Sequence, residues 1–153
     1  MTTPLKIAET ECWRISGVRN AEAFFQSVPQ LIPEATHLFL EGAPAPDIMA
    51  IILTHADQRE YAAPIGTVWS WPQRNQRFVL AASSALFARL SEAAAQHAEP
   101  EICFHLHIYR DSEPLVQWFD AFDDPLFVSK VVPRARVEQF CLAAGGVLAD
   151  TGP

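Results

Sequence analysis

Residues 102–109 alternate strictly between two kinds of side chain, and this pattern constrains the fold most. The apolar positions and the positions between them are Ile102, Phe104, Leu106 and Ile108, and Cys103, His105, His107 and Tyr109. Successive side chains of a β-strand point to opposite faces, so the pattern is typical of a strand with one face in the core. A loop at 111–114 then leads into a second apolar run at 115–122. We therefore expect a β-hairpin in the C-terminal half, which excludes an all-helical fold.

Helical segments are expected before and after this hairpin. Asn20 can cap a first helix, which Pro29 should kink or stop because proline removes a backbone hydrogen bond. A second helix is expected around 48–55 with Asp47 as its cap, although so short an apolar run also fits a strand. Further helices are expected from about Ser84 and from Pro133 to Gly145. Short strands are expected at 12–15, 37–40, 67–71 and 77–80.

This order of elements predicts an α+β fold. We expect a mixed β-sheet with about four helices packed on it, and a C-terminal β-hairpin followed by a terminal helix. The 153 residues are typical of one domain, so residues 1–153 are expected to fold together. A chain of this length can bury a sufficient core without a metal or a disulfide.

Cysteine usage and hydropathy indicate where the protein functions. Three cysteines without a Cys-x-x-Cys pair argue against a disulfide framework and favour a reducing compartment. The longest apolar stretch, Ile48–Leu53, is much shorter than the roughly 20 residues that span a bilayer. The N-terminal residues lack the pattern of a secretory signal. We therefore expect a cytoplasmic protein that does not bind a membrane.

The charge of the chain favours a basic partner. A net charge of −7 repels phosphate backbones, so nucleic-acid binding is not expected. From Glu92 to Asp124 eight acidic residues accompany a single basic residue, Arg110. Such a cluster can attract a basic protein, although for any single charge a solvated surface is the simpler interpretation. The acidic candidates for binding residues are Asp120, Asp123 and Asp124.

Tryptophan supplies two more candidate binding residues. Trp69 and Trp71 would share one face of an expected strand, and Trp118 could lie near them. Tryptophan is frequent at binding hot spots because it buries a large area and keeps a polar group. Packing in the core is the alternative interpretation of both residues.

His105 and His107 form the strongest candidate for catalytic chemistry. Both side chains would point to the same face of a strand. With an even number of residues in the hairpin loop, His105 would face Asp120, and these three residues could bind Zn²⁺ and leave a position open for water. With an odd number, His105 would face Phe119 and Asp120 would point away. A polar sheet face without metal is the alternative interpretation of this pattern.

Other catalytic signatures are absent from the sequence. It contains no G-x-S-x-G elbow, P-loop or dinucleotide-binding motif. Ser83 and Ser84 are better explained as a helix cap. Cys103 shares a strand face with His105, but a reactive thiol needs nearby positive charge and this segment is acidic. We therefore expect no cofactor, apart from zinc under the metal hypothesis.

Four segments of the chain resemble a family of uncharacterised small bacterial proteins. These segments are Gly66–Trp69, His97–Glu101, His105–Arg110 and Trp118–Leu126. The likeness extends over about the C-terminal two thirds of the chain. No activity, cofactor or site is associated with that family, so the resemblance implies only a bacterial cytosolic origin.

Two functional hypotheses follow from these features. The first is a non-enzymatic protein-binding domain, in its most concrete form an immunity-type protein that neutralises a basic toxin. The alternative is a metal-dependent hydrolase or metal-binding module that uses His105, His107 and Asp120, with Asp123 or Asp124 as the base. A small-molecule binding domain is a third hypothesis, which requires a concave pocket.

Overall fold

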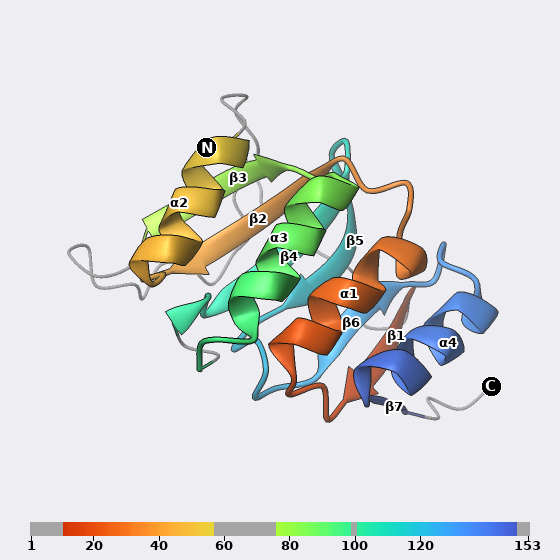
Figure 1. Cartoon of the computed structure of the whole chain (residues 1–153). Helices are drawn as coiled ribbons and strands as arrows, with labels where there is room; N and C mark the ends of the chain where they lie inside the picture. The colour runs from red at the N-terminus through yellow and green to blue at the C-terminus, as the bar shows by residue number, and fades with distance from the viewer. Residues whose placement is uncertain (1–10, 57–75, 99–100, 150–153) are drawn as a thin grey trace.

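The computed structural model describes residues 11–56, 76–98 and 101–149. In these residues, four helices lie side by side across one face of a seven-stranded sheet (Figure 1). The strand order is β3-β2-β4-β5-β6-β1-β7. The predicted α+β class, with about four helices on a sheet and a hairpin before a terminal helix, is confirmed. Each strand pair in the described part is antiparallel, so this sheet is more uniform than the mixed one expected.

The strands are β1 (Cys12–Ser16), β2 (His37–Gly42), β3 (Gln76–Ala81), β4 (His105–Arg110), β5 (Glu113–Trp118), β6 (Leu126–Ser129) and β7 (Val147–Leu148). The expected strands near 12–15, 37–40 and 77–80 are therefore confirmed, and the hairpin consists of β4 and β5. The sequence did not indicate β6 and β7, which have four and two residues. The expected strand at 67–71, with Trp69 and Trp71, lies outside the described residues.

The helices are α1 (Ala21–Leu31), α2 (Pro46–His55), α3 (Ser84–Ala94) and α4 (Arg134–Ala144). Asn20 caps α1 as predicted, since its side chain accepts a hydrogen bond from the amide of Ala23. Pro29 does not end that helix, which continues to Leu31 because Val28 and Leu31 are buried on its inner face. The predicted cap Asp47 is wrong. Ala45 occupies the cap position of α2 without a side-chain bond, and Asp47 lies in the first turn.

The core lies between the helices and the sheet. Leu106 and Ile108 of β4 are fully buried on the covered face, as the alternating pattern predicted, but His107 and Tyr109 on the other face are buried too. Phe24 of α1 is central, because its ring contacts the rings of Trp118 and Phe122 at 4.9 and 6.1 Å between centroids. Each fully buried side chain of this size contributes about 1.5–3 kcal/mol to folding. Among the helices in the described ranges, none is long and apolar enough to cross a membrane.

Candidate functional site

Polar side chains from β2, β3 and β4 gather on the sheet face opposite the helices. Glu41 of β2 is almost fully buried and lies across from His105 of β4. One oxygen of its carboxylate, Oε1, accepts a hydrogen bond from Nε of Arg77 at 3.0 Å. The other oxygen, Oε2, lies 3.6 Å from Nε2 of His105 and accepts no hydrogen bond. A buried carboxylate is costly unless it is paired, so Arg77 and His105 keep Glu41 compatible with the fold.

The two histidines of β4 hold the following strand through its backbone. Nδ1 of His105 accepts the amide of Asp120 at 3.0 Å, and Nδ1 of His107 accepts the amide of Trp118 at 3.2 Å. A ring nitrogen that accepts a hydrogen bond carries no proton, so in each neutral ring the proton is on Nε2. Burial, with a smaller contribution from His105, lowers the pKa of His107 to about 3. His107 is therefore neutral near pH 7.

The hairpin loop has an even number of residues, Asp111 and Ser112, yet the register beyond it is the one expected of an odd loop. Leu106 lies opposite Trp118 and His107 opposite Gln117, because a bulge at Leu115 adds one residue to β5. The ring of His105 accordingly meets that of Phe119, with 5.7 Å between centroids. The Asp120 side chain is thus not the cross-strand partner of His105, and the two residues interact through the backbone amide of Asp120 instead.

This arrangement gives the metal hypothesis no support. Among the described residues, no three His, Cys, Asp or Glu side chains form a group that could hold a metal ion. His105, His107 and Asp120 all belong to the described part of the chain. Nδ1 of His105 and Nδ1 of His107 each accept a backbone amide, so only Nε2 of either ring could bind a metal.

Asp120, Asp123 and Asp124 lie on one turn between β5 and β6, which we call the acidic turn (residues 120–124). All three residues are exposed. The carbonyl of Asp120 accepts the amides of both Asp123 and Asp124 at 3.0 Å. Arg19 lies beside the turn, with its guanidinium 3.7 Å from the carboxylate of Asp123 and bonded to the carbonyl of Phe122. The structure therefore places the three predicted acidic residues together.

The core fixes the acidic turn from the inside. The side chain of Phe122 is buried, and its ring lies 4.6 Å from that of Trp118. Nε1 of Trp118 donates to the carbonyl of Asp124 at 2.7 Å. Asp120 and Phe122 have positive φ angles of 49° and 73°, a region that side chains with a Cβ rarely adopt. Such a conformation persists only where the surroundings determine it, so the backbone that carries the three carboxylates is held in place.

Three of the remaining acidic residues of the 92–124 segment, Glu101, Asp111 and Glu113, are divided between the two ends of the hairpin. Glu92 lies on α3, and Glu99 lies outside the described residues. Asp111 and Glu113 lie at the β4–β5 turn, at the opposite end of β5 from Asp120. Arg110 forms an ion pair with Glu113 there. Glu101 lies near the start of α2, where its carbonyl accepts the amide of Ala45. The single acidic face expected from the sequence is therefore split, and the acidic turn is its main concentration.

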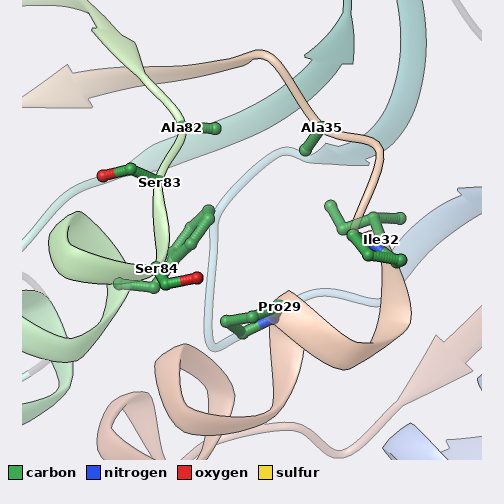
Figure 2. Close-up of a pocket in the computed structure, with 8 residues that line it drawn as sticks. Pro29, Ile32, Ala35, Ala82, Ser83 and Ser84 are labelled. Atoms are coloured by element: carbon green, nitrogen blue, oxygen red, sulfur yellow. The ribbon is translucent and has the colours of Figure 1, made fainter.

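Two hollows lie beside the helix ends. One, with a volume of about 360 Å³, adjoins the acidic turn and is lined by Arg19, Asn20, Glu22 and His97 together with three alanines. The other, of about 120 Å³, lies between the end of α1 and the start of α3, among Pro29, Ile32, Ala82 and Ser84 (Figure 2). The second is smaller than the roughly 300 Å³ typical of small-molecule sites. Of these two hollows, the one next to the acidic turn reaches that size.

The described residues do not provide an activated nucleophile. Cys12, Cys103 and Cys141 are buried and form no disulfide. Burial raises the pKa of the Cys103 thiol to about 12, so its reactive thiolate is not populated at neutral pH. Ser83 is a helix cap as predicted, because its hydroxyl accepts the amide of Leu86 at the start of α3.

Comparisons with known proteins identified no relative of this chain. No family model matches the chain, and no curated protein or solved structure is significantly similar to it. This agrees with the resemblance to a family without an assigned function, from which no activity or site can be transferred.

Sequence reasoning missed Glu41, Arg77, Arg19 and Phe122 as parts of this region. Glu41 had a detectable signal, because it is a charged residue at the end of the apolar run Leu38–Leu40. A carboxylate that is buried in a central strand of a sheet needs a hydrogen-bond donor or a positive charge beside it. The partner itself could not be found, since Arg77 and His105 come from strands distant in sequence.

Proposed function

We propose that this chain is a non-enzymatic protein-binding domain whose acidic turn contacts a basic protein partner. The observation that carries this proposal is the presentation of three exposed aspartates on a turn that Phe122 and Trp118 fix to the core. A turn whose backbone is already ordered needs no further backbone ordering when a partner arrives, which lowers the entropic cost of association. An immunity-type protein that neutralises a basic toxin is the concrete form of this function.

The electrostatics of the region support a basic partner. Among the described residues, Asp120 and Asp124 form no ion pair, and the pair between Asp123 and Arg19 is largely exposed to solvent. An exposed pair contributes at most about 1 kcal/mol, so a partner's lysine or arginine can replace Arg19 at little cost. The net charge of −7 adds long-range attraction.

The first test combines capture with charge reversal. The tagged wild-type chain is used to capture partners from a lysate of the cells that produce it, in parallel with a variant in which Asp120, Asp123 and Asp124 are changed to Lys. We expect a stoichiometric basic protein with the wild type and its loss with the variant. A matched control carries Asp111→Lys, Glu113→Lys and Glu138→Lys, which changes the net charge equally away from the acidic turn. The control should retain the partner.

The second test measures association kinetics with the captured partner. Reversal of the acidic turn should reduce the association rate about 10-fold or more at low salt, and the difference should shrink as salt screens the charges. Equal association rates for the wild type and the variant would exclude the acidic turn as the binding surface. A partner that is acidic, or equal losses in the variant and the matched control, would also contradict the proposal.

A further inference from the structure

Three polar atoms on the sheet face opposite the helices are buried and have no hydrogen-bond partner among the described residues. They are Oε2 of Glu41, Nε2 of His107 and the hydroxyl of Tyr109. None of these residues is more than 3% exposed. Buried polar groups in native proteins almost always have a partner, which is either another protein group or an ordered water molecule. This face of the sheet therefore calls for a bound polar molecule.

Glu41 and His107 are diagonal neighbours on two paired strands. Glu41 of β2 lies opposite His105 of β4, and His107 is two residues further along β4 on the same face. Diagonal residues of an antiparallel pair are about 7–8 Å apart, within reach of long side chains. A water molecule can join two groups that are too far apart for a direct hydrogen bond, because each of its bonds spans about 2.8 Å. The spacing therefore suits a single bridging water.

The two unpartnered atoms have opposite hydrogen-bonding roles. Oε2 of Glu41 is an acceptor, and Nε2 of His105 lies 3.6 Å away from it, which is longer than a hydrogen bond. Nδ1 of His107 accepts the amide of Trp118, so the ring carries its proton on Nε2, which is a donor. A water molecule can donate to the carboxylate and accept from the ring at the same time. Both atoms are then satisfied.

The surroundings of the His107 ring favour a molecule as small as water. The ring lies against the rings of Phe39 and Phe119, with 5.6 and 4.7 Å between centroids. His107 itself is 0% exposed, so bulk solvent does not reach Nε2. A water molecule in such a place is held by the polar groups that it satisfies, and it is costly to remove.

We infer that an ordered water molecule binds between Oε2 of Glu41 and Nε2 of His107 and is a constituent part of this fold. The water keeps the ring proton on Nε2, and Nδ1 is then free to accept the amide of Trp118. Trp118 in turn donates from Nε1 to the carbonyl of Asp124, at the end of the acidic turn. The bound water thus begins a series of hydrogen bonds that leads from a buried carboxylate to the acidic turn.

The experiment is NMR on the full, isotopically labelled chain at neutral pH. The proton on Nε2 of His107 should be observed as a slowly exchanging ring N–H. It should also show cross-relaxation with protons at the water frequency, with the sign expected of a water molecule that tumbles with the protein. A ring that carries its proton on Nδ1, or an Nε2 proton without this cross-relaxation, would overturn the inference.

Two variants distinguish a bridging water from a neighbouring hydroxyl. Tyr109→Phe removes the nearby hydroxyl, whose exchanging proton can imitate water, and the signal at His107 should persist unchanged. Glu41→Leu removes the acceptor and replaces it with methyl groups, so the signal should be lost. Loss of the signal in Tyr109→Phe, or its full persistence in Glu41→Leu, contradicts the bridge.

A crystal structure of the unaltered chain gives a second measurement that does not depend on whether a variant folds. We expect density for one water about 2.8 Å from both atoms. A direct bond between Glu41 and His107, a metal ion or a larger molecule at this position would overturn the inference. The water site goes beyond the proposed function and needs no partner for its test, so its failure would leave the binding role of the acidic turn unaffected.

Discussion

Asp120 combines a left-handed backbone with an exposed side chain. The left-handed region brings the Cβ of an L-residue close to the following carbonyl oxygen, and glycine alone avoids this contact. Its φ of 49° is set by hydrogen bonds at both its amide and its carbonyl, while its carboxylate makes no ion pair within the described residues. A glycine would suit this backbone better. Aspartate nevertheless adopts this region more readily than most residues with a Cβ.

Replacing Asp120 should separate stability from binding. We expect Asp120→Gly to raise the free energy of unfolding by about 0.5–1 kcal/mol, because glycine removes the steric strain that a Cβ causes in the left-handed region. Asp120→Asn, which tolerates the same conformation, should stay within about 0.5 kcal/mol of the wild type. Urea denaturation measures both values. A clear loss of stability in Asp120→Gly would mean that the aspartate side chain stabilises the turn.

At the scale of elements, His97 links the start of α2 to the connection between α3 and β4. Its Nε2 lies 2.8 Å from the carboxylate of Asp47, and its Nδ1 lies 3.4 Å from that of Glu101. The hydrogen bond with Asp47 is the main cause of a raised pKa for His97, and the same bond lowers the pKa of Asp47. Asp47, predicted as a helix cap, thus serves as the partner of a histidine.

This link should make the attachment of α2 depend on pH. The pKa of His97 is raised from 6.5, so its contribution is complete below that value and is lost as pH rises through the folded pKa. The pKa of Asp47 is lowered from 3.8, so its contribution is present above that value and is lost as pH falls through the folded pKa. The link is therefore strongest between these two values.

The variant His97→Gln tests the link. It should lower the melting temperature more at about pH 5.5 than at about pH 8.5, because only the lower pH keeps His97 charged in the wild type. Asp47→Asn, which removes the same ion pair from the other side, should show the same pH pattern. Equal decreases in the melting temperature at both pH values would show that the His97 ring stabilises the fold by packing alone.

At the scale of the whole molecule, the sheet brings acidic residues from distant segments to one end. The acidic turn, Asp47 and Glu101 all lie at the end of the sheet where β2 and β5 finish. Basic residues lie at both ends: Arg19 and Arg77 are beside Asp123 and Glu41 at this end, whereas Arg110 and Arg134 are each paired with a glutamate at the other. Like charges gathered at one end repel one another, which costs stability and leaves a surface suited to an oppositely charged partner.

Removing the charge of the acidic turn should therefore not weaken the fold. A variant with Asn at positions 120, 123 and 124 is expected to unfold at the same or a slightly higher temperature, with a gain of at most about 1 kcal/mol at low salt. The gain should vanish in high salt, where the repulsion is screened. Thermal unfolding at both salt concentrations measures this. A strongly destabilised variant would assign the carboxylates a structural role.

The sequence predicted the helices and strands that are marked by patterns of a few neighbouring residues. The alternation in 102–109, the cap Asn20 and the stop Gly145 each indicated an element that the structure contains, because side-chain direction and helix capping are local properties. The strands β6 and β7 were missed because four and two residues carry too little pattern. They are strands because each hydrogen-bonds to β1.

The alternating residues of β4 by themselves determined that His105 and His107 share one face of the sheet. What those histidines contact was decided only in the tertiary structure. The sequence left the hairpin register open between an even and an odd spacing, and the bulge at Leu115 selected the odd one. Leu115 and Val116 are consecutive, yet both are fully buried in the same hydrophobic core, so the packing of this core fixes the bulge. That packing involves the whole sheet, which is why no local pattern could predict that His105 would hold the amide of Asp120.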